Sequence, residues 1–269
     1  MSFFVRSAFV ALVAALWGCS AAFGAPVAQN SKAKIEFGYP RVLGLTDGNP
    51  PFLTALFKAI YETEGFEVAY QELSFSRAIQ SLSLGGVDAV PMCLRYETPK
   101  VIWPRFPMWV GFGQLAFLKS RFPKGMQTGV LNGKRIVSLT GSALDAFFPK
   151  SVPTEVRTRE QGLKMVLAGR ADAFLDGVDG LQLSLRELAS KDRVLLDTFD
   201  FGEGPLYIRF QDTPKGRELV KIYNARFPRI VESGEYLKLL LKYEPFAGFS
   251  KRVTDAVLKY NASAKQTAE

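Results

Sequence analysis

Histidine is absent from this chain of 269 residues, and cysteine occurs only twice. Without histidine, a Ser–His or Cys–His dyad cannot form, and the commonest metal ligand is missing. The sequence also has no cluster of carboxylates at metal-ligand spacing and no glycine-rich phosphate loop of the GxxxxGK(S/T) type. These absences predict a protein that is not an enzyme and that holds neither a metal ion nor a cofactor.

The apolar run near the N-terminus is too short to cross a membrane, which takes about 20 residues. Arg6 precedes the run "AFVALVAALWG", and the small residues Ala22 and Gly24 follow it at positions suited to cleavage. Residues 1–24 are therefore predicted to be a signal peptide, so that the mature protein is secreted. The alternative is cleavage and acylation at Cys19 in "LWGC", which the bulky Trp17 disfavours.

Only Cys93 remains after cleavage behind Gly24, so no disulfide can form within the mature chain. Cys93 stands in the apolar run "AVPMCL", which is typical of a buried small hydrophobic residue rather than of a nucleophile. Neither the fold nor the function is expected to depend on its thiol.

Positive charge is in excess, with 34 lysines and arginines against 26 aspartates and glutamates and a formal net charge of +8. The basic residues form no dense run and are spread along the chain, and a secreted protein seldom meets nucleic acid. We therefore interpret most of this charge as solvated surface, with no nucleic-acid partner and with a modest preference for an anionic small ligand.

One motif occurs twice in the chain. "LSLGGVDAV" begins at Leu82 and "VLAGRADAF" at Val166, and their shared positions are 84 residues apart. That distance is too long for a solenoid repeat and indicates two similar lobes. In each copy an aspartate, Asp88 or Asp172, precedes an apolar strand, where we expect it to hydrogen-bond the connecting turn rather than a ligand.

The apolar patterns alternate between strand and helix spacing, as in a sheet covered by helices. In the first half, strands are predicted at residues 34–46, 66–73 and 87–94 and helices at 52–64 and 76–86. In the second half, strands are predicted at 134–139, 171–176, 193–199 and 204–211, and helices at 140–148, 160–169, 180–188, 214–233 and 234–245.

The order of these elements resembles that of the periplasmic solute-binding proteins of ABC transporters, of the polar amino-acid type (family 3). The resemblance runs from Lys34 to Pro245 and is carried by "GLTDGNPPF", "RAIQSLSLGGVDAV", "GKRIVSLTGSAL", "LAGRADAFLD" and "SGEYLKLLLKYEP". It implies an α/β protein with the two-lobed (type II) periplasmic binding protein fold, in which each lobe is a central sheet flanked by helices and two crossing strands join the lobes. It also implies a periplasmic monomer that captures a small polar ligand for an ABC-transporter membrane component.

In this division, lobe 1 comprises residues 33–113 and 211–248, lobe 2 comprises residues 114–210, and residues 249–269 form a C-terminal tail. The ligand is expected between the lobes, beyond the carboxyl ends of the strands, with closure by hinge bending.

Two loops of lobe 1 supply the first candidate ligand-binding residues. Asp47 and Asn49 stand in "TDGNPPF", where family members usually have an aromatic residue, and an ordinary turn explains them equally well. Phe75 and Arg77 begin a predicted helix. An arginine there opposes the helix dipole, so it needs an anionic partner, either a ligand or a neighbouring carboxylate.

The third loop, "MCLRYETPK", departs from the family. A gap-free match places Lys100 where the family has the arginine that binds an α-carboxylate, and Arg95 where a small polar residue is usual. Because a guanidinium binds a carboxylate with two parallel hydrogen bonds, Arg95 is a candidate to replace the missing arginine. The change favours an anionic ligand that differs from a plain α-amino acid.

Lobe 2 supplies three further candidates. Thr140 and Ser142 begin a predicted helix, where they suit either an anion site or simple N-capping. Asp176 lies close to the family position whose aspartate pairs with an α-amino group. In lobe 1, Trp103 and Trp109 are expected in the core rather than stacked on a ligand.

Two other functions remain open alongside transport. A secreted sensory or accessory module would bind a ligand without passing it to a transporter. A dehydratase of the same fold would use a carboxylate such as Glu97 or Asp176 as general acid.

Overall fold

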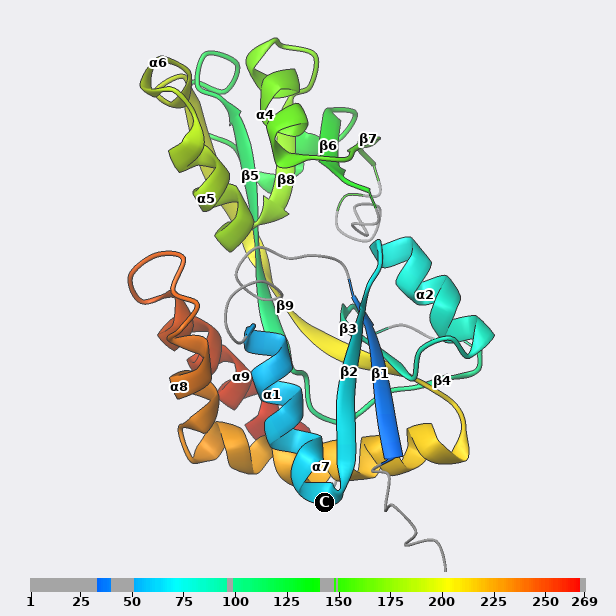
Figure 1. Ribbon diagram of the computed structural model, residues 1–269. Coiled ribbons are helices and arrows are strands. Elements are labelled where there is room, and N and C mark those ends of the chain that lie inside the picture. Colours follow the sequence, from blue (N-terminus) through cyan, green and yellow to red (C-terminus); the bar gives the residue numbers. More distant parts are fainter. Residues whose placement is uncertain (1–32, 40–50, 96–98, 141–147, 149, 267–269) are drawn as a thin grey trace, which may run out of the picture. The chain divides into compact units, whose positions relative to one another are not determined.

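The computed structural model describes residues 33–39, 51–95, 99–140, 148 and 150–266. The first sheet contains three parallel strands, in which β1 (Ala33–Tyr39) lies between β2 (Phe66–Glu72) and β3 (Ala89–Cys93). The connecting helices are α1 (Phe52–Tyr61), which a short 3₁₀ turn (Glu62–Glu64) follows, and α2 (Phe75–Leu84). This order confirms the strand and helix alternation that the sequence predicted for the first half (Figure 1).

The second sheet has a similar parallel core. β6 (Arg135–Leu139) lies between β7 (Val152–Val156) and β8 (Ala173–Gly177), and β5 (Trp109–Leu118) pairs antiparallel with β8. The helical segments of this part are a 3₁₀ turn (Thr128–Leu131), α4 (Arg159–Leu167), α5 (Val178–Glu187) and α6 (Ser190–Arg193). The helix predicted at 140–148 lies almost entirely outside the described residues.

One long strand, β9 (Leu196–Gln211), hydrogen-bonds to strands of both sheets (Figure 1). It pairs with β5 from Leu196 to Leu206, with β3 from Tyr207 to Phe210, and at its end with the two-residue strand β4 (Val101–Ile102). The sequence had predicted two separate strands here, at 193–199 and 204–211. That prediction was wrong because Gly202 (φ 142°) and Pro205 interrupt the strand pattern, whereas the pairing with β5 continues past them through a bulge.

Three helices complete the chain: α7 (Pro214–Glu232), α8 (Glu235–Leu240) and α9 (Phe249–Gln266). α7 and α8 were predicted, and their apolar faces pack with the first sheet. α9 fills most of the segment that the sequence analysis left as a tail. It buries Phe249, Val253 and Val257 at a spacing of four residues, which the polar residues between them obscure in the sequence. Within the described ranges, no helix has the length and apolar content needed to cross a membrane.

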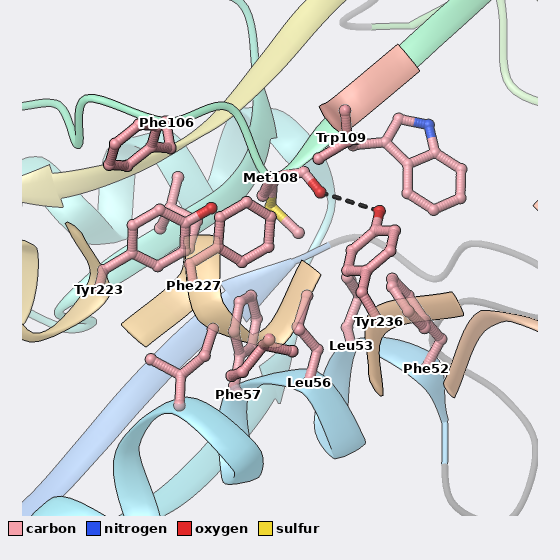
Figure 2. Packing of buried hydrophobic residues seen from close by; sticks show 14 of the residues in the cluster. Phe52, Leu53, Leu56, Phe57, Phe106, Met108, Trp109, Tyr223, Phe227 and Tyr236 are labelled. Atoms are coloured by element: carbon pink, nitrogen blue, oxygen red, sulfur yellow. Dashed lines mark hydrogen bonds between the residues drawn. The ribbon is translucent and has the colours of Figure 1, made fainter. Parts of the chain in front are cut away.

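The largest core cluster joins strands and helices that are far apart in sequence (Figure 2). Phe37 of β1 stacks on Phe57 of α1 with ring centroids 4.1 Å apart, and Tyr223 of α7 stacks on Phe227 at 4.7 Å. The Tyr236 hydroxyl of α8 donates a hydrogen bond of 3.0 Å to the backbone carbonyl of Met108, just before β5 (Figure 2). The core therefore fixes the start of β5 against the C-terminal helices.

The repeated motif has the same structural role in both sheets. The Asp88 carboxylate accepts a hydrogen bond of 2.8 Å from the backbone nitrogen of Glu36 in β1, and the Asp172 carboxylate accepts one of 2.8 Å from Arg135 in β6. In each copy a glycine with positive φ, Gly85 (78°) or Gly169 (68°), ends the preceding helical turn. The expectation that these aspartates are structural is confirmed, because each ties the start of its own strand to the neighbouring strand.

We predict opposite effects for two buried tyrosines of the same core. Tyr236→Phe leaves the Met108 carbonyl unpaired and is expected to lower the free energy of unfolding by about 1–2 kcal/mol. Tyr223→Phe removes a buried hydroxyl that has no hydrogen-bond partner among the described residues, so it is expected to leave stability unchanged or raise it by about 1 kcal/mol. Urea unfolding followed by circular dichroism measures both, and equal losses in the two variants would contradict the assignment.

The buried thiol of Cys93 is expected to be unreactive in the folded protein. Burial raises its pKa to about 12, because the thiolate cannot be solvated. At pH 8, a maleimide should modify Cys93 only after denaturant is added, as read from the mass of its peptide. Rapid modification in native buffer would show that the end of β3 opens to solvent.

Candidate functional site

Arg77 and Arg95 lie at the same edge of the first sheet. β2 and β3 run parallel on the two sides of β1, so their carboxyl ends meet at one edge. Arg77 is in the first turn of α2, which follows β2, and Arg95 comes two residues after β3. The structure thus brings together two of the predicted ligand-binding residues, with Phe75 beside Arg77.

The Arg77 side chain is exposed and forms no ion pair or hydrogen bond with a described residue. Its backbone nitrogen donates to the Ser74 hydroxyl, which caps α2. Phe75 packs against the small cluster under α2 that contains Ala78, Leu82 and Cys93. An arginine at this helix start was expected to pair with either a ligand or a neighbouring carboxylate. No carboxylate in the described part of the chain pairs with Arg77.

Arg95 lies over an aromatic residue that the sequence analysis did not select. Its guanidinium carbon is 5.6 Å from the ring centroid of Tyr207, which pairs with Cys93 across β9 and β3. Trp103 meets the same ring edge-on at 6.4 Å, and the Arg209 guanidinium lies 5.9 Å from the Trp103 ring. Side chains alternate between the two faces of a strand, so "PLYIRFQ" places Tyr207 and Arg209 on the same face. This alternation was the sequence signal that could have identified both residues.

Lys100 lies away from Arg77 and Arg95. Its backbone, at φ 61°, accepts a hydrogen bond of 2.9 Å from Asp212, directly beside the pair Val101 and Gln211. Because β9 runs antiparallel to β3, this level corresponds to the amino end of β3, about 13 Å from its carboxyl end at about 3.3 Å per residue. The structure does not bring Lys100 to the edge that carries the two arginines.

Thr140 and Asp176 lie at the carboxyl edge of the second sheet, because β6 and β8 are parallel neighbours. The Thr140 hydroxyl donates to the carbonyl of Val156, so it holds β6 to the end of β7. The remaining predicted residues, Asp47, Asn49 and Ser142, lie outside the described residues.

Asp176 forms an ion pair with Arg159, the first residue of α4. Both side chains are mostly buried, and the second Asp176 oxygen accepts a 2.8 Å hydrogen bond from the backbone nitrogen of Gly177. Burial raises the pKa of the Asp176 carboxyl, and the nearby Asp179 adds to this rise, against the effects of Arg159 and Gly177. Burial also opposes the charge of Arg159, but its attraction to Asp176 is stronger and raises the pKa of the guanidinium.

The sequence analysis did not select Arg159, although Arg159, like Arg77, is an arginine in the first turn of a helix. Here the partner is a carboxylate of the protein itself. The network continues to Asp179, which accepts a 3.2 Å hydrogen bond from the Tyr243 hydroxyl. Asp176 is therefore already satisfied by protein groups and does not offer a free carboxylate.

Trp109 belongs to the core, as expected. Its side chain is buried and its ring lies 5.8 Å from that of Phe52 and 5.9 Å from that of Phe249. Trp103 is half-buried between Tyr207 and Arg209.

A groove of about 480 Å³ lies elsewhere, between α9 and the paired strands β5 and β9. Its charged side chains pair with one another, as in Lys251 with Asp255 at 2.6 Å, and Arg252 covers the Phe112 ring at 3.9 Å. None of the predicted ligand-binding residues lines it. Since its charges are satisfied locally, we assign the candidate site to the strand ends rather than to this groove.

Loss of Arg159 should destabilise the protein far more than loss of an exposed cation on the same helix. Arg159→Ala leaves Asp176 buried without its partner and is expected to cost about 3 kcal/mol in urea unfolding. Lys164→Ala, which breaks an exposed pair with Glu160, is expected to leave stability almost unchanged, because water screens that pair. Similar costs for the two variants would mean that Asp176 does not depend on Arg159.

Neither a family model nor a curated protein matches the sequence.

Several solved structures match the fold. A histidine kinase sensor domain with similarity to periplasmic binding proteins superimposes with a TM-score of 0.67 at 15% identity, covering 80% of this chain and 98% of its own. A putative ABC-transporter binding component from Wolinella succinogenes complexed with lysine gives 0.61 at 18% identity, covering 78% and 94%. An ancestral amino acid-binding protein, AncCDT-1, described as a precursor of cyclohexadienyl dehydratase, gives 0.60 at 19% identity, covering 78% and 94%. The chain therefore has the α/β, two-lobed fold of periplasmic binding proteins that its sequence predicted.

Proposed function

We propose that this chain is a solute-binding protein, which captures a small anionic or amino-acid-like ligand between two lobes and presents it to an ABC transporter. The observation that carries the proposal is the pair Arg77 and Arg95. Both are exposed at one carboxyl edge of the first sheet, and neither forms an ion pair with a described residue. In open α/β folds, ligands bind beyond this edge, and two unpaired guanidinium groups suit a carboxylate.

In this proposal, lobe 1 comprises residues 33–113 and 211–248, and lobe 2 comprises residues 114–210. The signal peptide at 1–24 directs the protein to the periplasm, where it is a monomer. The separate clusters around Leu115 and Ala116 in the second sheet support this division. The burial of α9 in the first cluster argues for adding residues 249–266 to lobe 1. Asp47, Asn49, Phe75, Thr140 and Ser142 remain proposed ligand contacts.

Asp176 and Lys100 have weaker claims to ligand contact than the two arginines. Both oxygens of Asp176 already accept hydrogen bonds, and Lys100 lies at the opposite edge of the sheet. Because both of its oxygens already accept hydrogen bonds, Asp176 is a poor general acid for a dehydratase, and Glu97, the other candidate acid, lies outside the described residues. The match to a kinase sensor domain favours sensing as the second candidate function, with the same binding site.

Thermal unfolding against a panel of amino acids, organic acids, amines and small peptides tests the proposal. A ligand at a hundred times its Kd stabilises the folded state by about 2.7 kcal/mol, which corresponds to a rise of about 5–10 °C for a chain of this size. Nuclear magnetic resonance of the ligand before and after incubation separates binding from turnover. A folded protein that responds to no member of the panel would overturn the transport function.

Arginine substitutions locate the site once a ligand is found. Arg77→Ala and Arg95→Ala should each weaken binding by about tenfold or more, because a charge-assisted hydrogen bond contributes about 1.5–3 kcal/mol. Arg229→Ala, which removes an exposed arginine from α7, should leave the affinity unchanged. Unchanged affinity in all three variants would place the ligand elsewhere.

A further inference from the structure

Five strands of the second sheet have their ends side by side at the edge opposite Thr140 and Asp176. β5 ends there, and β6, β7, β8 and β9 begin there. The register pairs are Leu118 with Leu196, Phe117 with Ala173, Ile136 with Ala173, and Arg135 with Val152. We call this surface the basic edge and define it as residues 119–124, 130–135, 150–152, 169–172 and 189–197.

The basic edge holds most of the excess positive charge of the chain. Its acidic residues are Asp172, Asp192 and Asp197, and its basic residues are Lys119, Arg121, Lys124, Lys134, Arg135, Lys150, Arg170, Lys191 and Arg193. The basic residues outnumber the acidic ones by six, compared with a net charge of +8 for the whole chain. The basic residues are spread along the sequence, but strand pairing brings segments that are far apart in sequence to this one edge.

Most of these cations are not neutralised within the protein. Asp172 pairs with Arg121 at 2.5 Å and with Arg135 at 3.6 Å, and Lys119 donates to the carbonyl of Val194. The other six form no ion pair with any residue in the described ranges. Five of these six are exposed, and Lys134 is half-buried.

Apolar side chains are exposed between the cations. Val194 is 60% exposed, Leu195 and Val152 are 50% exposed, and Val130 is 43% exposed. They are four of the seven large apolar residues that are exposed in the described part of the chain. Exposed aliphatic residues that are scattered singly need no explanation, but their concentration on a strongly basic surface does.

We propose that the basic edge docks on the surface of a bilayer that contains anionic phospholipids. The cations would face the headgroup phosphates, and the four aliphatic side chains would enter the boundary between headgroups and acyl chains. Five strand ends at about 4.8 Å spacing give a contact about 19 Å wide. A bilayer matches such a surface because its negative charge is continuous and its interior accepts aliphatic groups. An acidic protein would match the cations but leave these aliphatic groups against a polar surface.

Docking through the basic edge leaves the proposed ligand residues accessible. Thr140 follows the opposite end of β6, about 13 Å along that strand, and Asp176 lies next to the last residue of β8. The inference is therefore independent of the proposed ligand and of any transporter.

Co-sedimentation with lipid vesicles tests the proposal. The chain from Ala25 onward is used because it retains the whole unit Lys32–Glu269 and lacks the apolar N-terminal run. It should bind vesicles of phosphatidylcholine mixed with phosphatidylglycerol but not vesicles of phosphatidylcholine alone. Binding should weaken as salt is added, because the Debye length falls from about 10 Å at 0.1 M to about 3 Å at 1 M.

Matched substitutions locate the contact. A triple variant, Lys134→Gln, Lys150→Gln and Lys191→Gln, should lower partitioning onto the anionic vesicles about 100-fold, because each cation near such a surface contributes about fivefold. The control triple variant, Lys221→Gln, Lys238→Gln and Lys242→Gln, loses the same charge elsewhere and should bind like the unmodified protein. Leu195→Ser should weaken binding, whereas Leu241→Ser, at another exposed leucine, should not.

Equal binding to both vesicle types, or equal losses in the two triple variants, would overturn the proposal. Binding to soluble polyglutamate without binding to anionic vesicles would also overturn it, in favour of an acidic protein partner. Thermal unfolding midpoints close to that of the unmodified protein establish that each variant is folded.

Discussion

Backbone hydrogen bonding along β9 is the constraint on which the rest of the structure depends. This strand pairs with β5 over its first part and with β3 and β4 over its last part, so it is shared by both sheets. Each sheet otherwise has its own parallel strands and its own aspartate, Asp88 or Asp172, which ties two of those strands together. The pairing of β9 therefore joins the two groups of parallel strands into one hydrogen-bonded network.

The distribution of charge follows from which charges are paired inside the protein. The Asp88 carboxylate accepts a hydrogen bond from the backbone nitrogen of Glu36 and pairs with Lys215. Asp172 pairs with Arg121 and Arg135, and Asp176 pairs with Arg159. A carboxylate that accepts hydrogen bonds from the protein is not available to a ligand. Among the cations that form no ion pair with a described residue are Arg77 and Arg95 at one edge of the first sheet and six side chains at the basic edge of the second.

The helices and strands with clear periodicity were predictable, because each carries its own apolar pattern and its own terminal signals. Ser74 and Thr158 cap α2 and α4, and Gly85 and Gly169 follow them, so both copies of the repeated motif were recognisable. β9 was divided in two because glycines break its pattern, and α9 was missed because charged residues separate its apolar positions. Of the candidate site, the positions of Arg77 and Arg95 beyond strand ends and of Asp176 near the end of its strand were predictable. The pairing of Asp176 with Arg159 was not, since these residues are 17 positions apart and on different elements.

The sequence by itself determined the alternation of strands and helices in the first half, the two similar lobes and the structural role of the repeated aspartates, because these depend on local pattern and short-range hydrogen bonding. Only the tertiary structure decided which charges are free. It placed Lys100 away from the two arginines, satisfied Asp176 internally, and gathered basic residues from five segments at one edge of a sheet. The physical reason is that strand pairing brings together segments that are far apart in the sequence, so no single segment determines which charged side chains become its neighbours.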